Sequence, residues 1–156
     1  DGAGSKAHTV FGVILGTGVG AGIVIGKKIH KGKNKIAGEW GHNPLPWAHE
    51  GELPGKKCYC GRTGCLETFI SGPAIEREFK NLHGRNLKMK NIVKESGAGN
   101  LKAEQVIKNL EDRLARALAH VINILDPDSI VLGGGLSNID RLYSCLLYKS
   151  DAADES

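Results

Sequence analysis

The chain has 156 residues, of which 40% are hydrophobic and 24% are charged, and its formal net charge is +4. This length fits one domain with a real core, and no apolar run approaches the ~20 residues that cross a membrane. The basic residues are scattered and few aromatic residues accompany them, which disfavours a nucleic-acid partner. We therefore expect a globular protein that binds neither nucleic acid nor membrane.

Strands are predicted near both ends of the chain. Residues 9–15 are rich in β-branched and aromatic side chains, as in a buried strand, and a glycine-rich turn separates them from a second strand at residues 22–26. The turn at Gly26 indicates a hairpin into a third strand. Residues 129–132 form a fourth apolar run, and the three glycines after it, with Ser137 as a cap, predict a turn into another helix.

Two helices are predicted between these strands. Residues 73–83 form the first, with Pro73 at its start. Residues 102–125 form the longer one, because apolar residues recur every three or four positions and Pro127 ends the pattern. The stretch 32–66 is rich in glycine and proline and is predicted to be a loop. A strand that follows a long helix and leads through a turn into another helix indicates an α/β architecture.

The two ends of the chain carry their own expectations. Residues 145–156 follow neither a helix period nor a strand alternation, and they resemble the translation of a sequencing-library adapter joined to a truncated reading frame. We expect residues 1–144 to form the folded lobe and 145–156 to be a non-native tail. The chain starts without Met and without the regions of a signal peptide, which predicts a cytoplasmic fragment.

Three cysteines and a histidine form the most informative group. Cys58, Cys60 and Cys65 lie in one short glycine-containing segment, and His42 lies across a proline-rich loop. Cys58 and Cys60 are too close for a comfortable disulfide, whereas three thiolates and an imidazole complete a tetrahedral set for Zn²⁺. Four protein ligands leave no open position, so the zinc is expected to be structural. His49 is an alternative to His42, and small buried thiols beside an unrelated histidine are the alternative to a metal.

Two glycine-rich turns are candidate phosphate or nucleotide sites. In residues 16–22 the glycines let backbone N–H groups approach a phosphate, and the Thr17 hydroxyl adds a donor. The segment is neither a Walker loop nor a dinucleotide fingerprint, and a hairpin without a ligand is the alternative. The turn at 133–135 could hold a ligand against the backbone or at a helix N-terminus. Its alternative is a tight strand-to-helix crossover.

Two carboxylates, Glu39 and Glu67, flank the predicted metal loop. They could form an acid–base pair, but beside a closed metal site they are better suited to accept hydrogen bonds from the hydroxyls of a sugar. Two unrelated surface glutamates are the alternative. Trp40 and Trp47 are predicted to lie in the core of the loop rather than to form the wall of a ligand site.

These motifs, in this order, resemble the ROK family (repressor, ORF, kinase). The resemblance covers residues 1–144. The motifs that carry it are Gly16-Thr17-Gly18, Ala37-Gly38-Glu39-Trp40-Gly41-His42, Cys58-Tyr59-Cys60-Gly61, Gly64-Cys65-Leu66-Glu67 and Ile130-Val131-Leu132-Gly133-Gly134-Gly135. Within the family, residues 39–47 and 67–72 look most like bacterial fructokinases of the mannofructokinase type.

The resemblance implies a fold, a reaction and partners. The fold is the C-terminal lobe of an actin-like, ribonuclease-H-like ATPase with a zinc-binding loop at about residues 38–67. The reaction is ATP-dependent phosphorylation of a hexose at its 6-hydroxyl, with Mg²⁺ on the nucleotide and fructose as the expected substrate. Members of the family are often dimeric, which leaves a homodimer open to this protein.

The resemblance also implies roles for particular residues. Those expected at the sugar are Glu39, His42 and Glu67. Those expected at the zinc are His42, Cys58, Cys60 and Cys65. Those expected at the ATP phosphates are Gly16, Thr17 and Gly18, and those near the adenosine are Gly133, Gly134 and Gly135.

The catalytic aspartate of the family is expected upstream of residue 1, with the first phosphate motif, and Asp1 does not replace it. Without this general base and half of the phosphate clamp, the chain is expected to be inactive as it stands. Two rivals are a sugar-sensing repressor of the same family and a purely structural zinc module. Thr17 in an intact glycine turn favours the kinase over the repressor, and the two glycine turns argue against the module.

Overall fold

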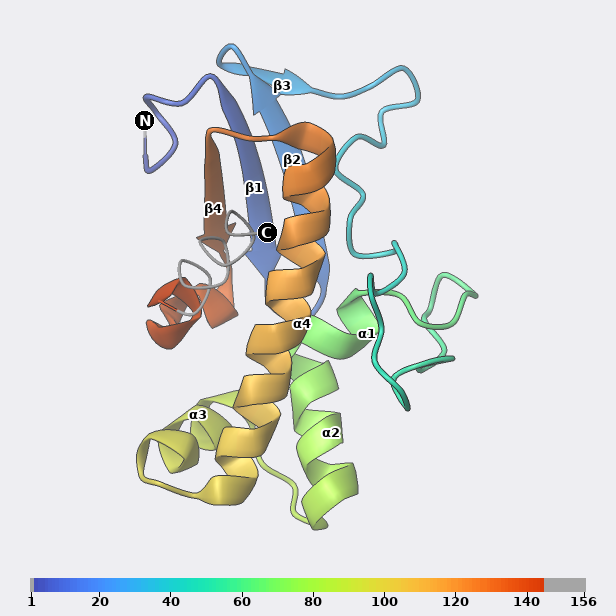
Figure 1. The fold of residues 1–156 in the computed structure, drawn as a ribbon, viewed down its shortest axis with the longest axis vertical. Helices are drawn as coiled ribbons and strands as arrows, with labels where there is room; N and C mark the ends of the chain where they lie inside the picture. Colours follow the sequence, from blue (N-terminus) through green and yellow to red (C-terminus); the bar gives the residue numbers. More distant parts are fainter. Residues whose placement is uncertain (1, 145–156) are drawn as a thin grey trace.

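A four-stranded mixed sheet forms one end of the computed structural model, which describes residues 2–144 (Figure 1). Its strands are β1 (Thr9–Leu15), β2 (Val19–Ile25), β3 (Lys28–His30) and β4 (Ser129–Gly133). In the order β3-β2-β1-β4, β1 is antiparallel to β2 and parallel to β4, and β2 is antiparallel to β3. The four predicted strands are therefore all present.

The glycine-rich segment after β1 is mostly strand. β2 begins at Val19 rather than at the predicted Gly22, because Val19 pairs with Leu15 and the following residues continue the ladder. Glycines without side chains leave this part of the sheet open on one face, where Ile14 is 63% exposed. The opposite face of β1 is buried through Phe11, Val13 and Leu15. Only residues 16–18 remain as the turn.

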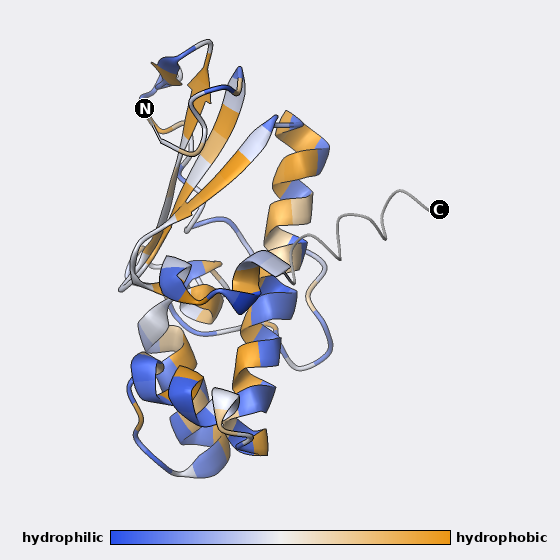
Figure 2. Ribbon diagram, turned by 90° about the vertical axis from the view of Figure 1, so that its left-hand side faces the viewer, coloured by the Kyte–Doolittle hydropathy of each residue, from blue (hydrophilic) through white to orange (hydrophobic). Residues whose placement is uncertain are grey.

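The longest helix, α4 (Leu101–Leu125), runs beside the sheet and down to the helical end of the molecule (Figure 1). It starts after Asn100, whose side chain accepts hydrogen bonds from two backbone N–H groups of the first turn, and it ends at Asp126, which has a left-handed φ of 45°. Apolar residues recur along its length between hydrophilic ones (Figure 2). The predicted helix at 102–125 is confirmed to within one residue.

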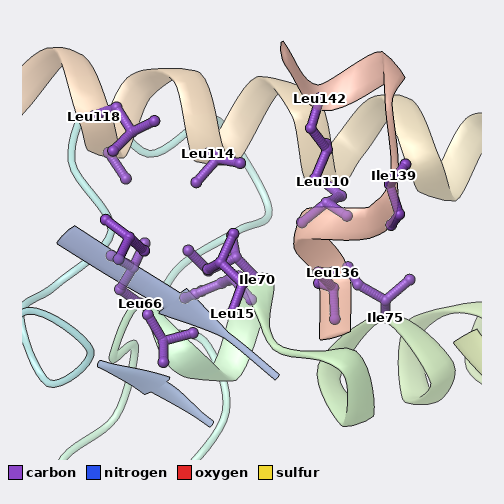
Figure 3. Packing of buried hydrophobic residues seen from close by; sticks show 14 of the residues in the cluster. Leu15, Leu66, Ile70, Ile75, Leu110, Leu114, Leu118, Leu136, Ile139 and Leu142 are labelled. Carbon is purple, nitrogen blue, oxygen red and sulfur yellow. The ribbon is translucent and has the colours of Figure 1, made fainter. Parts of the chain in front are cut away.

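The apolar stripe of α4 packs onto β1 and onto Leu66 at the end of the predicted metal loop. Leu114 and Leu118 of α4 face Leu15 of β1 and Leu66, while Leu110 lies nearer the C-terminal residues (Figure 3). All five side chains are at most 4% exposed. Burying a leucine side chain contributes about 2 kcal/mol, so this cluster ties the metal loop to the core.

Three shorter helices complete the core: α1 (Glu67–Ile70), α2 (Gly72–His83) and α3 (Met89–Gly97). α2 confirms the predicted helix at 73–83. Its N-cap is Ser71, Pro73 lies in its first turn, and Gly84 ends it with a φ of 70°. α1 and α3 were not predicted, because α1 has only four residues and α3 has no capping side chain.

Two further predictions concern the loop and the C-terminal residues. Residues 32–66 contain no helix or strand, as predicted. Ser137 does not cap a helix; it lies inside a 3₁₀ turn, η1 (Gly135–Asn138), and its hydroxyl donates to Gly134 O. Helical conformation resumes at Arg141. The predicted non-native tail at 145–156 lies outside the described residues, and among those described no helix is both long and apolar enough to span a membrane.

Candidate functional site

His42, Cys58, Cys60 and Cys65 come together in the segment between β3 and α1, as the sequence predicts. Their candidate ligand atoms all lie within 4.8 Å of one another. The Cys60 and Cys65 sulfurs are 3.6 Å apart, and His42 Nδ1 is 3.5 Å from Cys58 Sγ. A zinc–sulfur bond of about 2.3 Å puts two sulfurs of a tetrahedron roughly 3.8 Å apart, so these side chains fit a Zn²⁺ ion.

A tight backbone turn aims the thiols at one point. The Arg62 carbonyl accepts a hydrogen bond from Cys58 N–H at 2.7 Å, and the Cys58 carbonyl accepts one from Gly61 N–H at 3.0 Å. Gly61 and Gly64 have positive φ values of 91° and 73°, a region that glycine adopts without steric cost. The glycines between the cysteines therefore shape the turn, as expected.

The three thiols differ in environment. Burial raises the pKa of Cys58 to about 12 and also raises the pKa of Cys65. Cys60 is exposed, and a hydrogen bond from the Arg62 backbone lowers its pKa. These three described cysteines are free rather than disulfide-bonded. A metal ion that binds here must displace thiol protons, so its binding is coupled to proton release.

Glu67 connects the thiol cluster to the first glycine turn. Its Oε1 accepts a hydrogen bond from the Cys58 thiol at 3.1 Å and lies 3.9 Å from His42 Nδ1. Its Oε2 faces the turn, because a Cβ added to Gly18 would lie 3.3 Å from it. The Glu67 N–H donates to Gly41 O at 3.0 Å, and the side chain is only 12% exposed. The carboxylate is therefore fixed between the imidazole and the glycine turn.

Glu39 and Tyr59 complete this surface. Glu39 is exposed, and the carboxylates of Glu67 and Glu39 both raise the pKa of Tyr59, Glu67 with the larger effect. The Tyr59 hydroxyl lies 2.9 Å from His42 Nε2. All three residues expected at the sugar therefore act on one aromatic side chain, His42 by direct contact and the two carboxylates electrostatically. Tyr59 was not predicted to be a site residue. Its position between two predicted metal ligands, Cys58 and Cys60, was the available signal in the sequence.

The alternative metal ligand, His49, lies away from the thiols. Its Nε2 is 3.2 Å from Asp112 Oδ2 on α4. Nearby, Arg116 of α4 contacts both oxygens of Glu52, at 2.9 and 3.0 Å, and donates to two carbonyls of the loop. The alternative ligand is therefore wrong, and α4 holds this part of the loop through ion pairs.

The two tryptophans of the loop have different environments. Trp40 is 4% exposed and packs edge-on against Phe11, as predicted for a core residue. Trp47 is 56% exposed and contacts His120 of α4 edge-on, so its prediction as a core residue is wrong. Its φ of 45° is in the left-handed region.

A cleft of about 750 Å³ lies between the glycine turns and the α2–α3 pair. Gly16 and Thr17 line it from the first turn, and Gly135 lines it from the second. The two turns lie side by side because β1 and β4 are parallel neighbours, with Ile14 paired to Gly133. Three of the six residues expected at the nucleotide therefore face one cleft.

The other three glycines are not among the residues that line this cleft. Gly18 faces Glu67, and Gly133 ends β4. Gly134 packs so closely on β1 that a Cβ would lie 2.4 Å from Leu15 O, and its φ is 84°. Gly134 therefore has no room for a side chain.

Residues of α2 and of the start of α3, which were not predicted to belong to a site, form another wall of the cleft. Glu76 of α2 accepts a hydrogen bond from Met89 N–H at 2.9 Å and pairs with Lys88 Nζ at 3.1 Å. These residues and Lys90 line the cleft. The available signal in the sequence was Lys88-Met89-Lys90. It could not be interpreted, because α3, which brings these residues to the cleft, was not predicted.

Comparison with known proteins adds the family. Residues 1–151 match the ROK family. The chain is similar to the N-acetyl-D-glucosamine kinase of Pectobacterium carotovorum, with 40% identity over 141 residues, which cover 88% of this chain and 46% of that protein. It is also similar in structure to a ROK hexokinase from Thermus thermophilus, with a TM-score of 0.82 and 30% identity, covering 94% of this chain and 48% of the hexokinase.

A third relative is the ROK family glucokinase from Streptomyces griseus, solved with glucose and AMPPNP. Its TM-score is 0.77 at 27% identity, and the match covers 94% of this chain and 53% of the glucokinase. The chain thus spans about half the length of the relatives it matches. The likeness supports the actin-like α/β fold of ROK sugar kinases, whereas the expectation of a fructokinase gains no support from these relatives. With the match running over residues 1–151, the chain belongs to the ROK family.

Proposed function

We propose that this chain is the sugar-binding half of an ATP-dependent sugar kinase. The position of Glu67 carries the proposal, because its two oxygens lie between His42 and the glycine turn at Gly18. A carboxylate there would hold a sugar hydroxyl beside a backbone that can hold a phosphate. Such positioning is most of what phosphoryl transfer requires of a protein. Glu39 would supply further hydrogen bonds to the sugar, and His42, whose Nε2 meets the Tyr59 hydroxyl, would hold that hydroxyl beside it.

The proposed role of zinc is structural. His42 and the three cysteines would occupy all four positions of a tetrahedral ion, which leaves none for a substrate. Bound zinc would fix the direction of the His42 ring, and with it the imidazole edge that faces Tyr59. The ion would therefore act on the sugar site through His42.

ATP is proposed to occupy the cleft between the two glycine turns. The N–H groups of the first turn and the Thr17 hydroxyl would meet its phosphates, and residues around Gly135 would lie against the nucleoside. Mg²⁺ on the nucleotide would neutralise phosphate charge. A sugar-sensing repressor would need the sugar site but not this cleft, so the exposure of Thr17 to the cleft favours the kinase.

The proposed substrate is a hexose, with N-acetyl-D-glucosamine as the first candidate. It is the sugar named for the relative that is 40% identical to this chain. Fructose is the second candidate, and the resemblance of residues 39–47 to fructokinases is the observation in its favour. Both sugars offer several hydroxyls to carboxylate acceptors, so the carboxylates alone do not distinguish them.

The experiment measures sugar binding by calorimetry on the zinc-loaded 156-residue chain, with N-acetyl-D-glucosamine, glucose and fructose. We expect at least one sugar to bind, and Glu67→Gln to weaken that binding by about tenfold or more, because a charged hydrogen bond contributes about 1.5–3 kcal/mol. Glu50→Gln is the matched control. Glu50 is an exposed glutamate of the same loop, and its variant should bind like the unaltered chain.

Two results would contradict the proposal: no sugar binds the unaltered chain, or Glu67→Gln binds as tightly as the control. We also expect the chain with ATP, Mg²⁺ and sugar to form no sugar phosphate, since the general base is expected outside residues 1–156. Sugar phosphate formed by the purified chain would overturn this last expectation alone.

A further inference from the structure

Tyr59 is an exposed aromatic residue that is held by a predicted metal ligand rather than by the core. Its side chain is 84% exposed. Its hydroxyl lies 2.9 Å from His42 Nε2, and its ring meets the imidazole edge-on, with centroids 5.0 Å apart and an interplanar angle of 79°. His42 in turn lies 3.9 Å, through its Nδ1, from Oε1 of Glu67. Tyr59 therefore lies at the same surface as the proposed sugar ligands.

The direction of the His42 ring decides which atoms can donate. Its Nδ1 faces the thiol cluster, 3.5 Å from Cys58 Sγ. A metal ion held by Nδ1 would leave the ring proton on Nε2, and Nε2–H would then donate to the Tyr59 oxygen. The hydroxyl hydrogen of Tyr59 is then free to donate outward. Glu39 and Glu67, when ionised, only accept hydrogen bonds, so Tyr59 supplies the kind of group that they lack.

We propose that Tyr59 is a specificity-determining residue whose hydroxyl donates to an acetamido carbonyl oxygen of the sugar. This inference rests on the proposed function. A carbonyl oxygen only accepts, so it gains from a fixed donor, whereas a sugar hydroxyl can turn to serve either neighbour. A site that is built to hydrogen-bond one group discriminates most strongly against sugars that lack it. The substrate class is therefore an N-acetylated hexosamine.

The test compares Tyr59→Phe with the unaltered zinc-loaded chain. This change keeps the ring and removes only the hydroxyl. Affinity for N-acetyl-D-glucosamine, measured by calorimetry, should fall by about fivefold to tenfold, the usual effect of one lost hydrogen bond. Affinity for glucose should change by less than about twofold. Tyr143→Phe is the matched control, since Tyr143 donates to Ser137 O beyond the sheet and should affect neither sugar.

Each outcome is decisive. A selective loss for the acetylated sugar supports the inference. An equal loss for both sugars, no loss for either, or a gain in affinity overturns it, and a gain would mean that the sugar displaces Tyr59 from His42.

If the unaltered chain binds sugar through Glu67 but Tyr59→Phe behaves like the control, this inference fails alone. If the unaltered chain binds no sugar, the proposed function fails and takes this inference with it. Zinc content and urea midpoint should match between the variants.

Discussion

Gly41 determines how closely the site loop can approach the sheet. A Cβ at this position would lie 2.1 Å from Val19 O on β2, which is inside any allowed contact. Gly38 is similar, because its Cβ would lie 2.7 Å from Ala21 O and its φ is 88°. These glycines flank Glu39 and adjoin His42, so backbone contact with β2 positions two of the proposed sugar ligands. Glu39 and His42 are therefore positioned because Gly38 and Gly41 have no side chains that would keep the loop away from β2.

The first prediction concerns Gly41→Ala. Because the added methyl group meets backbone rather than a flexible side chain, the variant should lose roughly 2–3 kcal/mol of unfolding free energy. Urea denaturation followed by fluorescence measures the loss. Gly20→Ala is the control, since that glycine of β2 has open space around its Cβ position and no positive φ. Equal midpoints for the two variants would show that the loop moves away from β2 at little cost.

At the scale of elements, Arg141 joins the C-terminal residues to two helices. Its guanidinium contacts Glu104 of α4 at 2.7 and 2.9 Å, Glu111 of α4, and Ser96 of α3 at 3.3 Å. The Glu111 side chain is 8% exposed, so its charge depends on this partner. Asn138 and Ile139, just before Arg141, line the cleft that is proposed to hold ATP, so this ion pair supports one wall of that cleft.

Removal of that guanidinium should be costly. Arg141→Met leaves Glu111 as a buried carboxylate without its cation, and we expect a loss of roughly 3 kcal/mol at pH 7. Arg85→Met is the matched control, because Arg85 forms a two-point pair with Glu95 but is 55% exposed. That surface pair should contribute less than about 1 kcal/mol. A similar loss in both variants would contradict the difference in burial.

The same ion pair predicts a pH dependence. Hydrogen bonds from Arg141 lower the pKa of Glu104 to about 2 from an ordinary value of 4.5. A lowered folded-state pKa gives stability that is fully present above about pH 4.5 and is lost as the pH falls towards about 2. The difference between the unaltered chain and Arg141→Met in urea should therefore shrink from pH 5 to pH 2. A constant difference over that range would assign the loss to packing alone.

At the scale of the whole molecule, the long loop has two kinds of anchor. One is the thiol and imidazole cluster, and the other is the pairing of Arg113 and Arg116 on α4 with Glu52. The sheet and α4 have their own apolar core, built from residues such as Leu15 and Leu114. We therefore predict that the predicted metal loop is a local unit and that the core keeps its structure without the metal.

Metal removal tests this organisation. A chelator should release zinc and increase hydrogen exchange at residues 56–66, with the amides of β1 and α4 still protected, because only the loop loses contact with the ion. The protected core in the same sample is the internal control. Loss of protection throughout would mean that the fold depends on the metal. No change in the loop would mean that the cluster holds no structural metal.

Periodic and apolar patterns in the sequence were sufficient to predict α4, β1 and β4. The 3.6-residue repeat of α4 and the apolar runs of β1 and β4 gave these elements to within one residue, because burial of one face imposes those periods. The start of β2 was misplaced, since glycines have no side chains to show which face is buried. Short helices such as α1 and α3 gave too little periodicity to detect.

The sequence by itself determined the three thiols, the two carboxylates and the family, because residue identity and order carry that information locally. Only the tertiary structure decided that His42 rather than His49 joins the thiols, that Trp47 lies outside, and that Tyr59 meets His42. It also decided that Glu67 lies against the Gly18 turn and that Glu76 and Lys88 line the cleft. These contacts join residues that are far apart in the sequence. They form because β1 and β4 are parallel neighbours and because the loop is anchored to α4, and spacing along the chain does not give such distances in space.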